Sequence, residues 1–242
     1  SSSSSPPSPP PPPATLAWRP VHTLPDWNTT DLFDGFLFLG AGHDLNGRSL
    51  PFHKGETTAL WKEKNSFFKK YNIRYVLNMA STDKELRDMS YSVQQGSIKY
   101  KGLPMNDVDE FTNQMATMFD QGASFIEECC VNHLSMKARL KEQEQNELEE
   151  DRDPSKQQPN TVPLSIYVHC VAGVNRSAMV VVWWMVKYRA WNLREAWGTV
   201  CRIRDDSCKW RNNTLGGSPE DKKSNWFIGA FNTLLADKDA LN

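Results

Sequence analysis

The chain has 242 residues, of which 39% are hydrophobic and 24% charged, and its formal net charge is −1. This content can bury one substantial core and gives no reason to expect a second. A charge so close to zero excludes a global field that would draw nucleic acid or an anionic membrane, and the longest apolar run, Ala178–Val186, is far shorter than the roughly 20 residues that span a bilayer.

The N-terminal residues have a composition of their own. Ser1–Pro13 consists of serine and proline only, which cannot form a core and favours extended polyproline II conformation. We therefore expect a disordered tail over residues 1–16, followed by one domain over residues 17–242. Several Pro-x-x-Pro registers would suit an SH3 or WW module, although an idle linker is the interpretation we favour.

The first half of the domain alternates between strand and helix patterns. Apolar runs that end near Gly or Pro predict three strands, at residues 36–39, 74–79 and 98–103. Helix-like spacing over Ala59–Tyr71 predicts a helix between the first two strands. A long amphipathic helix is expected from about Thr112, because apolar side chains recur along one stripe as far as Cys130.

A charge-rich segment follows Leu134. Residues Lys137–Asp153 hold four basic and seven acidic side chains with almost nothing apolar, so they are not core. The segment either prolongs the preceding helix into solvent or forms a disordered excursion. It could serve as a partner-binding arm or as a solvated spacer, and we favour the spacer.

The last third of the chain predicts one more strand and three helices. The strand Leu164–His169 should deliver Cys170 to the carboxyl edge of a parallel sheet, where ligands bind in α/β proteins. A buried helix containing Ala178–Val186 and an amphipathic helix over Leu193–Arg204 come next. Residues 205–224 predict a loop, and residues 226–235 predict a closing helix.

The turn between that strand and the buried helix carries the chemistry. Cys170 and Arg176 stand at the two ends of a five-residue turn made of Val171, Ala172, Gly173, Val174 and Asn175. Successive N–H groups of such a turn, together with the start of a helix, can cradle a phosphate dianion. The same positive field favours a Cys170 thiolate, and the Arg176 fork can hold two oxygens of a phosphoryl group. Ser177 offers a hydroxyl to the departing thiolate.

This run resembles the His-Cys-x5-Arg-Ser/Thr signature of the cysteine-dependent protein phosphatases, in particular the dual-specificity branch of the protein tyrosine phosphatase superfamily. Asn175 departs from the usual serine, but Asn tolerates left-handed backbone and can hydrogen-bond locally, so the turn should survive. The resemblance covers most of residues 36–235. It implies an α/β fold with a central, mostly parallel sheet flanked by helices. Relatives cross residues 135–163 in a few residues, so this chain resembles an atypical member with a charged insertion there.

Thiolate attack on phosphorus also needs an acid that protonates the leaving oxygen. Asp107 matches the position of the family's acid, a few residues past the third strand, and Asp109 is the alternative. His169 stands beside the nucleophile on a strand, so its side chain points to the opposite face; the family implies a structural role that keeps the cysteine pKa low. Arg202 and Arg204 either add positive potential near the mouth of the site or lie on the surface.

The resemblance implies a phosphatase that acts on phosphotyrosine in proteins, and on phosphoserine and phosphothreonine in the dual-specificity manner, through a phosphocysteine intermediate and without a cofactor. The histidines lack the spacing of metal ligands, so no metal is expected. The alternatives are an RNA 5′-triphosphatase, whose pattern shares an Asn before the arginine, a non-catalytic phosphopeptide-binding scaffold, and sulfur transfer by a rhodanese-like loop. The last has no use for an upstream Asp or for Ser177.

The expected partner is a phosphorylated protein, with neither nucleic acid nor a membrane. The five cysteines show no disulfide framework and no basic leader precedes an apolar stretch, which favours a cytoplasmic or nuclear location. The sequence does not fix the physiological substrate, the preference between phosphotyrosine and phosphoserine or phosphothreonine, the oligomeric state, or whether the N-terminus is native.

Overall fold

The computed structural model describes residues 30–33, 35–41, 68–69, 71–80, 98–105, 111–149, 163–171, 173–207, 229–230, 232–234 and 236. Its strands are β1 (Thr30–Asp31), β2 (Leu37–Ala41), β3 (Ile73–Asn78), β4 (Lys99–Gly102) and β5 (Ser165–Cys170). Its labelled helices are α4 (Asn113–Glu149), α5 (Arg176–Arg189) and α6 (Leu193–Ser207).

The strands form one sheet in the order β1-β2-β5-β3-β4. The short β1 runs antiparallel to β2, and the other neighbouring pairs are parallel. The expected mostly parallel sheet is therefore confirmed. Because β5 lies between β2 and β3, it is hydrogen-bonded along both edges, and all six of its residues are buried. Such a strand carries a nearly continuous apolar run rather than a strict alternation.

Most of the elements predicted from the sequence are present with ends shifted by a few residues. The exceptions have simple causes. β1 has two residues, too few to give a pattern, and α6 runs on to Ser207, so the loop expected from residue 205 begins later. Of the helix expected over 59–71, only Phe68 and Lys69 are described as helical, and the tail lies outside the described residues. The described residues of the closing segment are helical.

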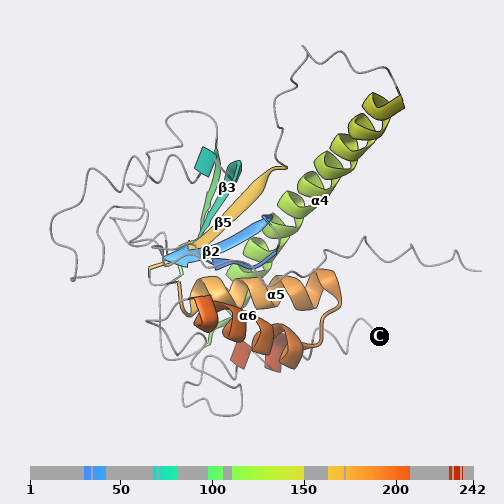
Figure 1. Cartoon of the computed structure of the whole chain (residues 1–242). Helices are drawn as coiled ribbons and strands as arrows, with labels where there is room; N and C mark the ends of the chain where they lie inside the picture. The colour runs from blue at the N-terminus through green and yellow to red at the C-terminus, as the bar shows by residue number, and fades with distance from the viewer. Residues whose placement is uncertain are drawn as a thin grey trace, which may run out of the picture.

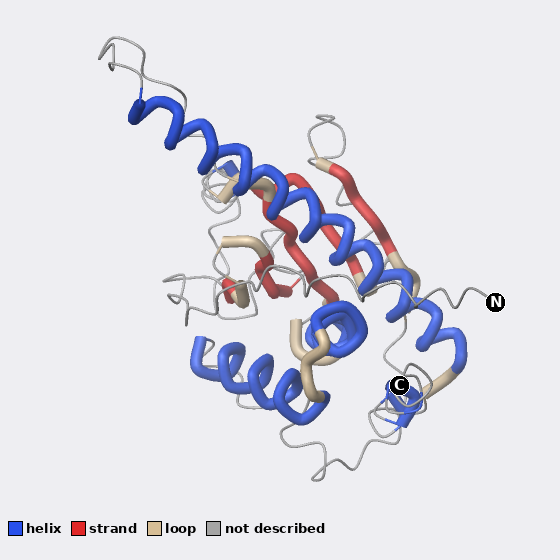
Figure 2. The backbone as a smooth tube through the Cα atoms, turned by 90° about the vertical axis from the view of Figure 1, so that its right-hand side faces the viewer, coloured by secondary structure: helices blue, strands red, loops and turns tan. Residues whose placement is uncertain are grey.

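Helices lie against the sheet (Figures 1 and 2). Aromatic and apolar side chains from the sheet and the helices form one buried core. On one face, Tyr75 of β3 meets Phe125 of α4, with ring centroids 6.2 Å apart. On the other face, Phe68 meets Tyr167 of β5, with centroids 5.9 Å apart. The sheet is thus covered on both sides, as a parallel sheet requires.

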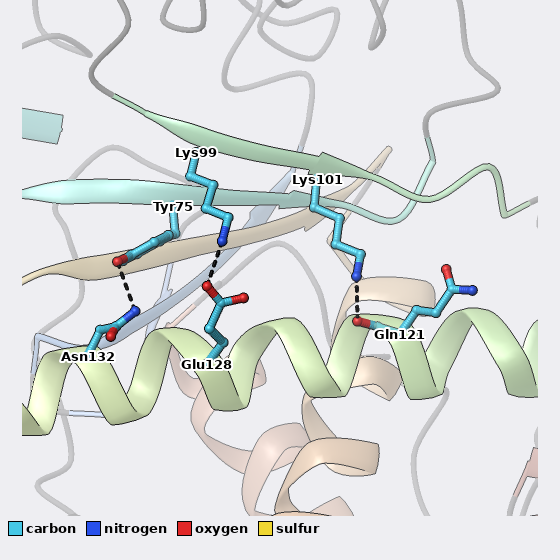
Figure 3. Close-up of polar contacts among 6 residues, drawn as sticks. All are labelled: Tyr75, Lys99, Lys101, Gln121, Glu128 and Asn132. Atoms are coloured by element: carbon cyan, nitrogen blue, oxygen red, sulfur yellow. Dashed lines mark hydrogen bonds and ion pairs between the residues drawn. The ribbon is translucent and has the colours of Figure 1, made fainter.

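Polar contacts tie the β3–β4 edge to α4 (Figure 3). Lys99 forms an ion pair with Glu128 at 2.5 Å, and the Lys101 ammonium donates to the Gln121 carbonyl at 3.0 Å. The Asn132 amide donates to the Tyr75 hydroxyl at 3.3 Å. The Lys99 and Glu128 side chains are about half exposed, so their pair adds little to stability.

Helix α4 continues beyond the sheet as one straight element (Figure 1). Of the two alternatives for the charged segment, helix is the one that the structure shows as far as Glu149. No side chain described between Ser135 and Gln145 is buried. The domain limits and the insertion over residues 135–163 stay predictions, since residues 150–162 lie outside the described part of the chain.

Helices α4 and α5 approach closely at Gly122. A Cβ atom at this position would lie 2.6 Å from Cγ2 of Val180, a buried and rotationally stiff side chain of α5. We expect Gly122→Ala to destabilise the fold by about 1–3 kcal/mol through overpacking, reduced by the gain of up to about 1 kcal/mol in helix propensity. Urea denaturation measures this change.

Gly198→Ala is the matched control, because Gly198 lies in α6 and a Cβ atom there would have nothing within 4 Å. That variant should gain the helix propensity alone. Equal unfolding free energies for the two variants would contradict close packing of α4 on α5.

Candidate active site

Cys170 is the last residue of the central strand, and it is only 2% exposed. Its parallel partner on β2 is Ala41, so the carboxyl ends of β2 and β5 meet beside it. The turn after Cys170 leads directly into α5, which begins at Arg176. The structure thus brings together the predicted nucleophile, the turn and the helix N-terminus.

Two donors point at the Cys170 sulfur. The Gly173 N–H and the Ser177 hydroxyl each donate to Sγ at 3.2 Å. Burial is the largest influence on the thiol and raises its pKa, but the Arg176 charge and the hydrogen bonds from Ser177 and Gly173 together outweigh it. The pKa of Cys170 therefore lies below its ordinary value, and the thiolate is favoured.

Among the described residues of the turn, Gly173 is the one whose conformation demands glycine. Its φ is +69°, and a Cβ there would lie 2.5 Å from the carbonyl oxygen of Gly40 on β2. Asn175 does not use the left-handed backbone that this residue type tolerates. It has right-handed helical backbone at φ −108° and ψ −77° and makes no side-chain capping bond among the described residues. The turn therefore survives the serine-to-asparagine departure without left-handed backbone at that residue.

Arg176 is buried and reaches across the site. Its Nη1 donates to the carbonyl oxygen of Met105 at 2.8 Å. Met105 follows β4 and stands just before the segment that holds both predicted acids. Asp107 and Asp109 lie outside the described residues, as does Ala172 of the turn. The assignment of the acid to one of the two carboxylates stays a prediction.

His169 is fully buried and precedes Cys170 on β5, so its side chain lies on the opposite face of the strand. Its ring stands 5.7 Å from that of Tyr167, and Nδ1 lies 3.2 Å from the Cys170 carbonyl oxygen. Burial lowers the pKa of His169 to about 4, although the contact with that carbonyl opposes the shift. The imidazole is neutral at physiological pH, so it supplies no charge to the sulfur.

The two arginines of α6 have different environments. Arg202 is exposed, whereas Arg204 is fully buried and its Nε donates to the carbonyl oxygen of Gly173 at 3.2 Å. The surface alternative is wrong for Arg204, because its side chain is buried in contact with the backbone of the turn. Sequence reasoning missed this contact, since a backbone carbonyl gives no signal in the sequence.

The two cysteines of α4 lack the activation that Cys170 has. Cys129 and Cys130 are buried, and burial is the main reason why their thiol pKa values are raised.

Among the described residues, no group of three His, Cys, Asp or Glu side chains could hold a metal ion. Nor does any helix within the described ranges have the length and apolarity to cross a membrane.

Residues 156–214 match the family model of the dual specificity phosphatase catalytic domain, a range that includes the whole turn. The part of the chain around the turn is thus similar to the catalytic domain of the dual specificity phosphatases. It is similar to the dual specificity protein phosphatase Mpk3 of Drosophila melanogaster, with 25% identity over 172 residues. That match covers 70% of this chain but only 28% of the relative.

Solved structures of phosphatases are similar to this chain in fold. A mutant form of Tk-PTP matches with a TM-score of 0.50 and 17% identity, over 89% of this chain and 99% of the other. DUSP15 matches with a TM-score of 0.46 and 14% identity, over 84% of this chain and 83% of the other. The expected protein tyrosine phosphatase-like fold is confirmed.

The hydroxyl of Ser177 should help to set the reactivity of Cys170. Ser177→Ala removes a hydrogen bond to the sulfur, so we expect the pKa of Cys170 to rise and its alkylation by iodoacetamide at neutral pH to slow about 10-fold. The measurement is the alkylation rate against pH, with the labelled peptide identified by mass spectrometry. Ser177→Thr keeps the hydroxyl and serves as the control. An unchanged profile in Ser177→Ala would show that this bond does not stabilise the thiolate.

Proposed function

We propose that this chain is an active dual-specificity protein phosphatase, which hydrolyses phosphotyrosine, and phosphoserine and phosphothreonine, through a phosphocysteine intermediate. The observation that carries the proposal is the Cys170 sulfur, which accepts two hydrogen bonds and has a lowered pKa at the end of a parallel strand. A scaffold that only binds phosphopeptides has no need of an activated thiol.

The reaction would proceed in two displacements at phosphorus. In the first, the Cys170 thiolate forms a bond to phosphorus while the bond to the substrate oxygen breaks, and Asp107 supplies the proton to that oxygen. In the second, water attacks the phosphocysteine and gives a proton to the Asp107 carboxylate, while the S–P bond breaks and inorganic phosphate is released. The Ser177 hydroxyl, 3.2 Å from the sulfur, stabilises the departing thiolate. Arg176 holds phosphoryl oxygens in both steps.

The low charge of the turn supports a phosphorylated protein as the substrate. Val171, Gly173 and Val174 carry no charge, which leaves Arg176 as the cation that the turn itself contributes. Enzymes that bind inositol polyphosphates place basic residues inside this turn. A monoester with one phosphate is therefore the better match, and we infer a cytoplasmic or nuclear setting for such a substrate.

An RNA 5′-triphosphatase is the second candidate, because Asn175 precedes the arginine in that branch as well. The two candidates separate in one assay series. Phosphopeptides, a 5′-triphosphorylated RNA and phosphoinositide vesicles are compared at equal enzyme concentration, and the proposal expects the highest kcat/KM on phosphopeptides. Preferential release of the RNA γ-phosphate would favour the second candidate.

Cys170→Ser should abolish hydrolysis of p-nitrophenyl phosphate while tungstate, a phosphate analogue, still binds, because serine keeps the shape of the site without a ready anion. A radiolabelled phosphoenzyme, trapped by rapid acid quench, should form on the parent protein and be missing from this variant. Parent-like turnover in Cys170→Ser would refute the mechanism.

Arg176→Lys should lose most of the activity on p-nitrophenyl phosphate, since a lysine cannot bind two oxygens in the same plane.

The two acid candidates differ in their dependence on the leaving group. Asp107→Asn should slow hydrolysis of phosphotyrosine peptides by about 10²-fold or more, the usual contribution of a positioned acid, while Asp109→Asn costs far less. The deficit should shrink on an aryl phosphate whose phenol has a low pKa, because such a leaving group needs little protonation. A large, leaving-group-dependent loss in Asp109→Asn instead would reassign the acid.

A further inference from the structure

The backbone of Gly173 is held at both of its polar atoms. Its N–H donates to the Cys170 sulfur at 3.2 Å, and its carbonyl oxygen accepts from Nε of Arg204 at 3.2 Å. Gly173 also has left-handed backbone and lies against the carbonyl of Gly40. Three elements thus fix one glycine: β5 through the sulfur, β2 through Gly40, and α6 through Arg204.

A cradle of inward-pointing N–H groups has carbonyl groups that point outward, away from the anion. An outward carbonyl that is buried needs a donor, since an unpaired buried carbonyl is costly. Arg204 provides this donor to Gly173 and is itself fully buried. The match between a buried guanidinium and a backbone oxygen that needs a donor accounts for an arginine at this place in α6.

The contact also determines the direction of the next amide. The Gly173 carbonyl and the Val174 N–H belong to one planar trans peptide and point in opposite directions. Because the carbonyl points towards Arg204, the Val174 N–H must point away from Arg204.

We propose that Arg204 is a positioning residue of the phosphate-binding turn, which orients the Gly173–Val174 peptide so that its N–H faces a bound oxyanion. The inference rests on the proposed function in so far as the turn binds phosphate. In this role Arg204 acts through Gly173, whose carbonyl oxygen it contacts.

The test compares Arg204→Met and Arg204→Lys with Arg202→Met, an exposed arginine two residues away on the same helix. The readouts are the Kd of tungstate by calorimetry and the pH profile of Cys170 alkylation, neither of which requires turnover. Thermal midpoints and circular dichroism show whether each variant is folded. Arg204→Met removes the donor but keeps an apolar chain of similar length.

We expect Arg204→Met to weaken tungstate binding by about 10- to 100-fold, the value of a hydrogen bond from a charged donor, and to move Cys170 alkylation to higher pH. Arg204→Lys should weaken binding at least about threefold, because an ammonium cannot reproduce the planar donor. Arg202→Met should bind as the parent does. If Arg204→Met does not fold, Arg204→Lys decides alone.

Parent-like tungstate affinity and alkylation in a folded Arg204→Met, or in Arg204→Lys when it decides alone, would overturn the inference. Its failure is distinguishable from failure of the proposed function. A parent protein that binds tungstate without hydrolysing phosphoesters would refute the activity and leave the role of Arg204 intact. If the parent does not bind tungstate at all, the turn is not a phosphate site and the inference falls with it.

Discussion

The register of β5 is the constraint on which the site depends. This strand is buried along its whole length and paired on both edges, with Ile166 opposite Leu37 and Cys170 opposite Ala41. Side chains alternate between the two faces, so a slip by one residue would exchange the positions of Cys170 and His169. The packing of apolar residues from both faces therefore decides which of these two side chains meets the turn.

The rotation of α5 about its axis is specified by polar contacts rather than by its apolar surface. Its residues from Arg176 to Val186 are all buried, so hydrophobic burial alone gives little preference for one orientation. Trp183 and Lys187 both donate to Asp120 of α4, each at 2.7 Å. Beside them, the Trp184 indole and the Arg189 guanidinium share Glu127. These anchors orient the helix that begins at Arg176.

Local patterns and long-range contacts differ in how far the sequence predicts them. The strand before Cys170 and the helix after it follow from their continuous apolar runs, and the cysteine, glycine and arginine of the turn from their spacing. The contacts of Arg176 with Met105 and of Arg204 with Gly173 could not be predicted in this way. Each joins an arginine to a backbone carbonyl in a distant segment, and every residue has a carbonyl. The choice between Asp107 and Asp109 depends on a loop path that the local pattern does not encode.

The contrast between the thiols has a practical consequence for chemical labelling. Cys129 and Cys130 resist ionisation because they are buried in α4, whereas Cys170 is buried among donors that favour its anion. Reagents that require a thiolate should therefore distinguish Cys170 from this pair by electrostatics alone. Since Cys170 is only 2% exposed, size adds a second filter. A compact electrophile could serve as a site-directed probe where a bulky maleimide would be excluded.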